Sequence, residues 1–360
     1  DDTDIIAGFE RDWSNIPGHA EYLVRPIDKK QSAVTLYACD ELKIPITISA
    51  GKTNLTGSAT PKGGLILSMI NMKYPITTIN EKNKTAKSSV GAILENMRDD
   101  IINLSNKKLY YPVDPTSRQD ALVGGTISCN ASGFIPGEKG ATRYWVNSLK
   151  IILSNGYSAS IKREDYISED SKFLLLCDDK KLLIDVPNYH RPDIKNASGP
   201  FTASNSEIDF IDLIVGSEGI FSLVTEVEFN LADSPDNYLD IFITLPSEDD
   251  AIKLRGYLKE QNILYNLTAL EYFGYNCQNY MEHKDKLFKN NSSVGVYLQC
   301  PVFGKSMDDI IEEWVTLLDK SNCGIEDENV FLLNSPDNWR IFFEARHSMP
   351  SKALEKTKEL

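Results

Sequence analysis

The sequence predicts an α+β fold divided into two domains, and three observations support this prediction. The chain has 360 residues, which is more than one hydrophobic core usually holds. Apolar runs typical of strands and segments with helical periodicity follow one another along its length. A polar, proline-containing break at Asp233–Asp236 separates two series of such elements. We therefore place the domains at residues 1–232 and 233–360.

The first domain is expected to open with a β-α-β pattern. Tyr22–Pro26 and Ile44–Ile48 have the composition of strands, and Lys30–Glu41 between them carries apolar residues in a loosely helical arrangement. The elements expected next are a strand at Gly63–Leu67, a strand at Ala86–Val90, a helix at Ala92–Leu104 and an extended stretch at Leu109–Pro112.

A β-hairpin is expected further along this domain. Tyr144–Leu153 and Tyr157–Lys162 flank Ser154-Asn155-Gly156, and an Asn-Gly pair favours the tight turn of a hairpin. Two more strands are expected at Phe210–Gly216 and Ile220–Leu231.

The second domain is expected to be a small unit in which strands and helices alternate. The helix at Ser247–Glu260 begins with Ser247, a favoured N-cap residue, and Lys305–Lys320 has the pattern of an amphipathic helix. The strands expected around these helices are Tyr238–Leu245, Thr268–Phe273 and Val294–Gln299.

Composition and charge narrow the range of partners. The chain carries 52 acidic and 38 basic residues, a net charge of -14, and has no long basic stripe. Neutralising phosphates requires clustered Lys and Arg, so nucleic acid and anionic membrane are not expected partners. The six cysteines are too scattered for a redox or zinc motif, which predicts free thiols in a reducing compartment. No apolar stretch reaches the roughly 18 to 20 residues of a transmembrane segment. We expect a cytoplasmic protein, with any membrane association made through a partner.

A loop of small residues between Pro45 and Pro61 is the most informative stretch of the chain. It reads P-I-T-I-S-A-G-K-T-N-L-T-G-S-A-T-P, and its backbone can approach a bulky anion closely. Two other interpretations stay open at this point. Gly51-Lys52-Thr53 resembles the end of a nucleotide P-loop, although Ile46 stands where that motif requires glycine. An ordinary surface loop has a similar composition.

Two further regions of small residues follow. Asp114-Pro115-Thr116 precedes Gly124–Gly133, which leaves little room for bulky side chains. Pro115 fixes its own φ and biases Asp114 toward extended backbone, so this stretch is conformationally restricted. A pair of tight turns is the alternative explanation. The third region is Gly216-Ser217-Glu218-Gly219.

In this order and at this spacing, the three regions resemble the FAD-binding fold of the vanillyl-alcohol oxidase and para-cresol methylhydroxylase (PCMH) superfamily. Within it they resemble the FAD-linked oxidases of the D-lactate dehydrogenase and glycolate oxidase group. That group typically has R-G-G-G-T-x-L-T-G-G, G-G-x-x-x-x-N-A-x-G and G-S-E-G-T-L-G-I-V-T-E. This chain has S-A-G-K-T-N-L-T-G-S from Ser49, G-G-T-I-S-C-N-A-S-G from Gly124 and G-S-E-G-I-F-S-L-V-T-E from Gly216. The resemblance implies a PCMH-type FAD-binding domain of two α+β subdomains, followed by an α+β cap or substrate domain with an antiparallel sheet.

The resemblance also assigns residues to the cofactor. The first region would wrap the FAD diphosphate through backbone amides, the second would line the isoalloxazine and ribityl portion, and the third would close the adenosine side. The implied residues are Ser49, Ala50, Gly51, Lys52, Thr53, Asn54, Gly57 and Ser58 in the first region, Asp114, Pro115, Thr116, Gly124, Gly125, Ser128, Asn130, Ser132 and Gly133 in the second, and Glu218, Gly219 and Val224 in the third.

The chain departs from the group's pattern in three places. Lys52 replaces a glycine, and its side chain either adds a positive charge to the diphosphate or, as we favour, points to solvent. Relatives that attach FAD covalently often use a histidine in the first loop, and none of the four histidines lies there, so non-covalent FAD is expected. The H-x-G-D-G-N-x-H motif, whose histidines help bind a divalent metal in this group, has no counterpart, and the residues present predict no metal site. We therefore expect that about a hundred C-terminal residues of such a protein are missing.

The chemistry implied by the resemblance is oxidation of a small 2-hydroxy acid, of the D-lactate, glycolate or D-2-hydroxyglutarate class, by hydride transfer to flavin N5. Arg346 is the expected clamp for the substrate carboxylate, with an ordinary salt bridge as its alternative role. His347 is a candidate base, with a structural role as its alternative. The electron acceptor would be a protein or a quinone. A flavin-binding electron-transfer subunit with no catalysis of its own remains the alternative function.

Overall fold

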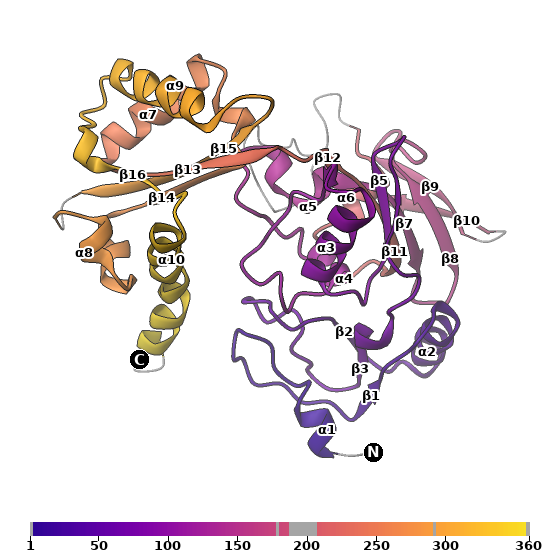
Figure 1. Cartoon of the computed structure of the whole chain (residues 1–360). Helices are drawn as coiled ribbons and strands as arrows, with labels where there is room; N and C mark the ends of the chain where they lie inside the picture. The colour runs from indigo at the N-terminus through magenta and orange to yellow at the C-terminus, as the bar shows by residue number, and fades with distance from the viewer. Residues whose placement is uncertain (1–2, 178–179, 187–206, 291–292, 358–360) are drawn as a thin grey trace. The chain divides into compact units, whose positions relative to one another are not determined.

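The computed structural model describes residues 3–177, 180–186, 207–290 and 293–357. The chain separates into two compact units, each of which is described by itself (Figure 1). Unit 1 comprises residues 1–133 and 137–234, and unit 2 comprises residues 134–136 and 235–360.

The strands of unit 1 form two main sheets and two short pairs. A three-stranded parallel sheet has the order β1-β3-β2, and a five-stranded antiparallel sheet has the order β4-β5-β11-β7-β8. The antiparallel pairs are β9-β10 and β6-β12. The strands of this unit are β1 (Tyr22–Val24), β2 (Ile46–Ser49), β3 (Leu65–Ser68), β4 (Thr78–Asn80), β5 (Thr85–Ser89), β6 (Leu109–Tyr110), β7 (Val146–Ile152), β8 (Ser158–Lys162), β9 (Lys172–Cys177), β10 (Lys180–Asp185), β11 (Leu223–Asn230) and β12 (Ala232–Asp233).

The helices of unit 1 flank these sheets. Helices α3, α4 and α6 lie on one face of the five-stranded sheet (Figure 1). Asp28 caps α2, since its carboxylate accepts a 2.8 Å hydrogen bond from the Gln31 N–H. The helices are α1 (Thr3–Ala7), α2 (Lys29–Leu42), α3 (Leu94–Leu104), α4 (Val123–Ser128), α5 (Thr142–Trp145) and α6 (Phe210–Ile214), with short 3₁₀ turns η1 (Met69–Asn71) and η2 (Glu138–Gly140).

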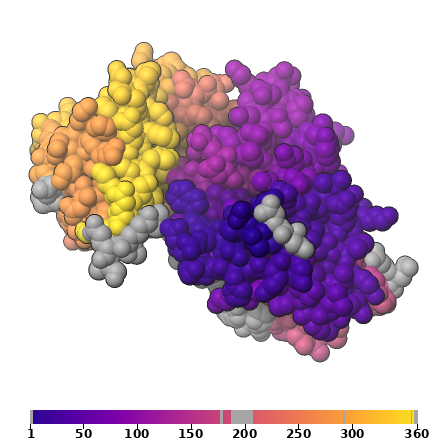
Figure 2. Space-filling view, turned by 90° about the horizontal axis from the view of Figure 1, so that it is seen from below, coloured from indigo at the N-terminus to yellow at the C-terminus, as the bar shows by residue number. Residues whose placement is uncertain are grey.

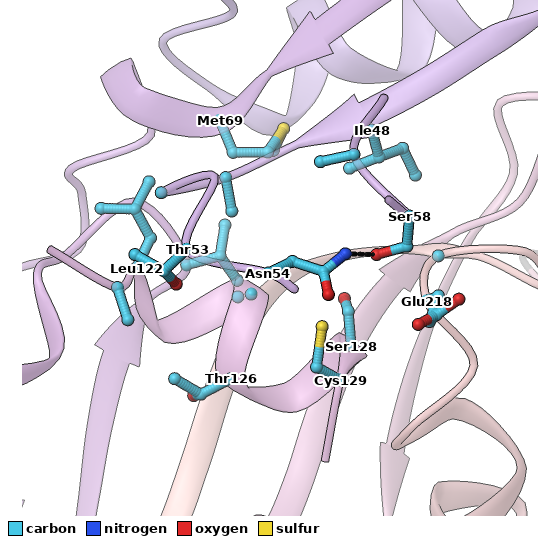
Figure 3. Close-up of a pocket in the computed structure, with 18 of the residues that line it drawn as sticks. Ile48, Thr53, Asn54, Ser58, Met69, Leu122, Thr126, Ser128, Cys129 and Glu218 are labelled. Atoms are coloured by element: carbon cyan, nitrogen blue, oxygen red, sulfur yellow. Dashed lines mark hydrogen bonds between the residues drawn. The ribbon is translucent and has the colours of Figure 1, made fainter. Parts of the chain in front are cut away.

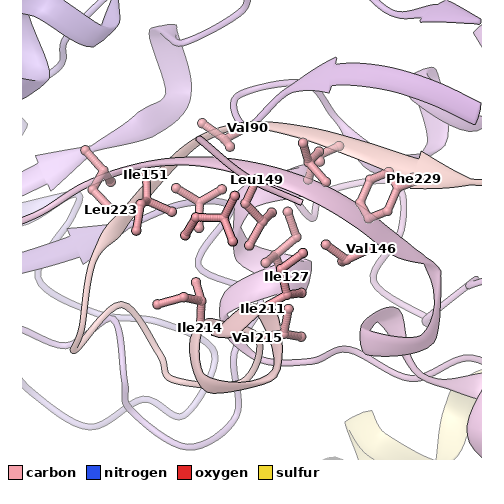
Figure 4. Close-up of a cluster of buried hydrophobic side chains, with 14 of the residues drawn as sticks. Val90, Ile127, Val146, Leu149, Ile151, Ile211, Ile214, Val215, Leu223 and Phe229 are labelled. Carbon is pink, nitrogen blue, oxygen red and sulfur yellow. The ribbon is translucent and has the colours of Figure 1, made fainter. Parts of the chain in front are cut away.

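The core of unit 1 lies between the five-stranded sheet and the helices on that face. Figure 4 shows Leu149 and Ile151 of β7 and Phe229 of β11 packed against Ile127 of α4 and Ile211 of α6. All five side chains are almost completely buried. Burying apolar side chains of this size contributes roughly 1.5–3 kcal/mol each, so this layer fixes α4 on the sheet.

Unit 2 is built on a four-stranded antiparallel sheet of order β14-β15-β13-β16. Successive residues of β13 face opposite sides: Ile241 and Ile243 join the core beneath α7 and α9, whereas Phe242 joins an aromatic core that includes Phe342 of α10. The elements are β13 (Asn237–Leu245), β14 (Ala269–Phe273), β15 (Val294–Val302), β16 (Val330–Leu332), α7 (Glu248–Glu260), α8 (Lys284–Leu287), α9 (Met307–Lys320), α10 (Pro336–Thr357), η3 (Leu264–Asn266), η4 (Tyr275–Tyr280) and η5 (Asp327–Asn329).

Most of the expected elements are present, within a few residues at their ends. The β7–β8 hairpin is confirmed, since Leu149 pairs with Ile161 across it. Ser247 does cap α7, its side chain accepting from the Asp250 N–H at 3.2 Å. The α+β prediction is confirmed, as is the antiparallel sheet of the second unit.

Two expectations were wrong in their local structure. The strand expected at Phe210–Gly216 is helix α6, which Asp209 caps by accepting from the Ile211 N–H. All five residues of α6 are buried, and a short run that is apolar on nearly every side carries no periodicity that distinguishes helix from strand. The strand expected from Tyr144 begins only at Val146, because residues 142–145 form α5.

Candidate functional site

A cavity of about 170 Å³ in unit 1 brings together the three regions of small residues. This volume exceeds the roughly 30 Å³ that one water molecule occupies, so it has room for part of a larger ligand. Figure 3 shows Asn54 and Ser58 facing Ser128, Cys129 and Glu218 across it, with Met69 and Ile48 on a further side. The predicted residues that line it are Ala50, Gly51, Lys52, Thr53, Asn54, Ser58, Gly124, Gly125, Ser128, Glu218, Gly219 and Val224.

The first loop leaves β2, the edge strand next to β3, and presents a series of unused hydrogen-bond donors. Within the described part of the chain, the N–H groups of the five consecutive residues Ala50–Asn54 donate to no protein acceptor. All five residues line the cavity. The five residues are half-buried, and successive backbone N–H groups of this kind form anion-binding concavities. The loop therefore fits a diphosphate.

Lys52, the residue that replaces a glycine, has a left-handed backbone with φ of 57°. A residue with a Cβ atom pays roughly 1–2 kcal/mol in this conformation, which explains why glycine is favoured at this position. Its ammonium group donates to the Gly8 carbonyl and lies 4.8 Å from the centre of the Phe9 ring. The side chain thus fastens the loop to the N-terminal segment. From the sequence we had favoured a Lys52 side chain that points to solvent.

Residues 124–128 of the second region belong to a short helix, α4 (Val123–Ser128), where the sequence had left a pair of tight turns as the alternative explanation. A Cβ atom on Gly124 would lie 2.8 Å from Cβ of Val90, and one on Gly125 would lie 3.1 Å from Cβ of Ala50. These glycines let α4 approach both β5 and the first loop. The Gly125 N–H has no acceptor within the described residues and adds a sixth donor to the cavity wall.

The third region is held against the second by its backbone. The Gly216 N–H donates to the Ile127 carbonyl at 3.0 Å, and the Glu218 N–H donates to the Ser128 carbonyl at 2.8 Å. Glu218 has φ of 53°, and its side chain lies at the cavity beside Cys129. Ser222, which also lines the cavity, is 6% exposed, and its hydroxyl has no partner among the described residues. Such a buried hydroxyl fits a polar ligand group.

Arg143 joins the second and third regions without lining the cavity. Its N–H donates to the Asn130 side-chain oxygen at 2.9 Å, and its Nη2 donates to the Val215 carbonyl at 2.6 Å. Its guanidinium also lies 3.8 Å from the Asp212 carboxylate, which Arg163 contacts at 3.0 Å. This buried network holds the backbone on both sides of the cavity.

Eight predicted cofactor residues lie outside the cavity lining, and their assignment to FAD stays a prediction. Asn130 is completely buried with φ of 46°, and Gly133 packs so closely that a Cβ atom would meet the Asp114 carboxylate at 2.4 Å. These two positions have evident structural roles. The eight residues are Ser49, Gly57, Asp114, Pro115, Thr116, Asn130, Ser132 and Gly133.

Sequence reasoning missed the apolar part of the lining. Side chains from several different elements form it, and no motif marks them because large apolar residues are common throughout the core. The missed residues, with the few polar ones among them, are Ile48, Ala59, Met69, Val90, Ser117, Ala121, Leu122, Thr126, Cys129, Ala131, Ser222 and Leu223. Apolar walls with a few placed polar groups are typical of cofactor sites.

Cys129 is open to the cavity and has an unusual environment for a thiol. Burial, together with the neighbouring Glu218 carboxylate, raises the pKa of the Cys129 thiol to about 11. The thiol is therefore protonated at neutral pH and is a poor nucleophile.

The predicted catalytic residues lie in unit 2, on α10. The guanidinium of Arg346 binds both oxygens of Glu271, at 2.7 Å each, and lies 4.2 Å from the centre of the Phe134 ring. The ring of His347 stacks on Phe343 at 3.7 Å between centroids. Arg346 therefore already holds one carboxylate, and the roles of both residues in substrate binding stay predictions.

Comparison with known proteins agrees with this geometry. Residues 20–161, which hold the first two regions, match the family model described as an FAD binding domain. This part of the chain is therefore similar to FAD-binding domains, and the curated relatives below are similar over a longer stretch. FAD is accordingly its cofactor, and the backbone donors and apolar walls of the cavity fit that molecule.

Three curated proteins are similar to this chain at low identity. D-lactate dehydrogenase of Anaerostipes hadrus is 24% identical over 69% of this chain and 44% of that protein. D-2-hydroxyglutarate dehydrogenase of Stutzerimonas stutzeri is 24% identical over 76% of this chain and 50% of that protein. Glycolate oxidase subunit GlcD of Bacillus subtilis is 28% identical over 59% of this chain and 37% of that protein. The chain thus spans half or less of the length of these relatives.

The solved structures confirm the PCMH-type fold. An alkyldihydroxyacetonephosphate synthase superposes with a TM-score of 0.60 over 90% of this chain and 55% of that chain, at 13% identity. At this identity the likeness concerns the fold alone. Among the described residues, no helix combines the length and the apolar character needed to cross a membrane.

Proposed function

We propose that this chain is the cofactor-binding part of an FAD-dependent oxidoreductase that oxidises a small 2-hydroxy acid of the D-lactate, glycolate or D-2-hydroxyglutarate class. The observation that carries the proposal is the series of N–H groups from Ala50 to Asn54, unpaired among the described residues, in a cavity with apolar walls. The names of the curated relatives support the choice of substrate class.

Different residues of the cavity bind different parts of the cofactor in this proposal. The N–H groups of Ala50–Asn54 and Gly125 bind the diphosphate, and the hydroxyl of Ser222 satisfies a further polar group. Met69, Val90 and Leu122 pack on the flat parts of the cofactor and exclude water. When bound, FAD supplies the acceptor for the hydride that leaves the hydroxy acid.

The substrate is held by its carboxylate in this proposal, and Arg346 is the proposed clamp. Because Glu271 engages the guanidinium, the substrate carboxylate binds either in place of Glu271 or beside it. His347 is the proposed base. A protein or a quinone takes the electrons, and the compartment is the cytoplasm.

Anaerobic reduction tests the enzyme function directly. The FAD-loaded protein is mixed with D-lactate, glycolate or D-2-hydroxyglutarate, with the L-isomers of the chiral acids as controls, and the visible flavin absorbance is followed. We expect bleaching with at least one of the three acids. If none bleaches the flavin but dithionite does, the chain is a flavin-binding electron-transfer subunit instead.

We also propose that FAD is bound non-covalently, because among the described residues no histidine and only one thiol, the protonated Cys129, line the cavity. Acid precipitation should release all flavin into the supernatant, where it is measured by fluorescence. Flavin that stays with the precipitated protein would contradict this.

A further inference from the structure

The first cofactor loop is held by residues that precede the part of the chain matched by the FAD-binding family model, which begins at residue 20. The Trp13 N–H donates to the Lys52 carbonyl at 3.0 Å, and the Lys52 ammonium donates to the Gly8 carbonyl. Residues near the N-terminus, indigo in Figure 2, lie at the surface of unit 1. We call residues 8–16 the N-terminal strap.

Asp12 is the centre of the strap's contact with the loop. The residue is only 5% exposed, and its carboxylate accepts four hydrogen bonds. Within the strap, the Ser14 N–H donates at 2.9 Å and the Ser14 hydroxyl at 2.5 Å. From the loop, the Asn54 amide and the Ala59 N–H each donate at 3.3 Å. A buried carboxylate thus fastens both ends of residues 54–59.

The loop needs such a fastening because its conformation is unfavourable by itself. Lys52 has φ of 57°, a left-handed conformation that is unfavourable for a residue with a Cβ atom. A strained segment persists only where its surroundings hold it. We propose that Asp12 is a positioning residue for the FAD diphosphate: it keeps the loop in the conformation that leaves the N–H groups of Ala50–Asn54 for the cofactor. The inference rests on the proposed flavin-binding function.

Because Asp12 is a carboxylate, its charge and its positioning role predict opposite effects of Asp12→Asn on FAD affinity. A carboxylate near a diphosphate repels it, so if charge dominated, Asp12→Asn would tighten FAD binding. If positioning dominates, the same change weakens binding. The amide has one acceptor oxygen, and its NH₂ group would face donors from Ser14, Asn54 or Ala59. Hydrogen bonds to a charged acceptor are also stronger than those to a neutral one.

The experiment measures the Kd of FAD, ADP and riboflavin for the apoprotein by fluorescence titration. We expect Asp12→Asn to raise the Kd of FAD and of ADP about tenfold, equivalent to about 1.4 kcal/mol, and to leave that of riboflavin unchanged. A merely structural role would change riboflavin and FAD binding by the same factor. That result, or an FAD Kd that stays the same or falls, overturns the proposal.

Glu10→Gln is the matched control. Glu10 is a half-buried carboxylate within the strap that accepts from the Ala20 N–H at 3.0 Å, a residue outside the loop. We expect its FAD Kd to stay within about twofold of the wild-type value. If Asp12→Asn does not fold, Ser14→Ala gives the same test with an expected weakening of about threefold, and an unchanged Kd there overturns the proposal. A wild-type protein that binds no FAD refutes the proposed function instead.

Discussion

Replacing Arg143 tests how the second and third cofactor regions are held together. Arg143→Met removes the 2.6 Å hydrogen bond to the Val215 carbonyl and the contact with Asp212. Methionine keeps much of the side-chain volume, so the change removes hydrogen bonding and charge with little loss of packing. Because Gly216 follows Val215 directly and Glu218 lies two residues further on, we expect the third region to shift away from α4.

The structure gives the size of the effect on stability. Val215 is 1% exposed, so its carbonyl would lose a donor where water does not replace it, at a cost of about 1–3 kcal/mol. Asp212 keeps Arg163 at 3.0 Å, so the change does not create the isolated buried charge that would cost about 3–5 kcal/mol. We expect a total loss of about 2–3 kcal/mol. For a unit of this size, that lowers the Tm by roughly 4–12 °C.

The assay is thermal unfolding of the apoprotein together with FAD titration well below the Tm. Arg163→Met is the control, since Arg163 shares Asp212 and donates to the Arg143 and Val146 carbonyls rather than to Val215. We expect Arg143→Met to weaken FAD binding about tenfold, or about 1.4 kcal/mol, and Arg163→Met to weaken it less than about threefold at a comparable loss of stability. Equal weakening by both variants would refute the reasoning, because FAD affinity would then follow general stability alone.

Three further predictions concern single sites. Arg346→Gln should raise the KM for the hydroxy acid by about tenfold or more, because hydrogen bonds to a charged group contribute about 1.5–3 kcal/mol. Glu271→Gln, which removes the carboxylate that now occupies Arg346, should leave the KM unchanged or lower it. If both variants lower the Tm and leave the KM unchanged, the only role of Arg346 is to bind Glu271. The pKa of the Cys129 thiol is raised to about 11, chiefly by burial. Its thiolate fraction should therefore rise about tenfold per pH unit from about pH 8 to pH 10, and the rate of Cys129 alkylation, measured by peptide mass spectrometry, should rise with it. A rate that levels off near pH 9 would show an ordinary thiol. Gly124→Ala should lower the free energy of unfolding by about 1–3 kcal/mol, because the new Cβ atom would lie 2.8 Å from Cβ of Val90. Gly256→Ala on α7 should raise it by about 0.5–1 kcal/mol, because its Cβ atom would meet no neighbouring atom within 4 Å. Chemical denaturation of both variants measures the difference, and equal effects would mean that α4 can move away from β5.

The sequence was informative where backbone conformation limits the choice of residue. Gly124 and Gly125 could be located in advance because only glycine permits the close approach of α4 to β5 and to the first loop. Val90 and Met69 could not, since an apolar residue that lines a cavity looks like any core residue until the chain folds. The helix α6 was missed for a related reason: the five buried residues 210–214 leave no exposed polar face to reveal a period.

Asp12 shows a different limit of the sequence. Nothing in its neighbourhood marks it, since acidic residues are common in this chain, and its partners Asn54 and Ala59 lie 42 and 47 positions away. A carboxylate that organises a distant loop is recognised only by its burial and by the donors around it.

Lys52 illustrates both points, the restriction set by backbone conformation and the contacts made with residues distant in the sequence. Comparison with the glycine-containing pattern suggests a substitution within the diphosphate loop, yet the backbone keeps the glycine-like φ of 57°, and the side chain is used elsewhere, on Gly8 and Phe9. The strain of roughly 1–2 kcal/mol from a left-handed lysine is offset by contacts with the N-terminal strap. The loop and the strap are therefore one structural device: the conformation that leaves five N–H groups for a diphosphate is unfavourable by itself, and residues outside the motif make it the stable one.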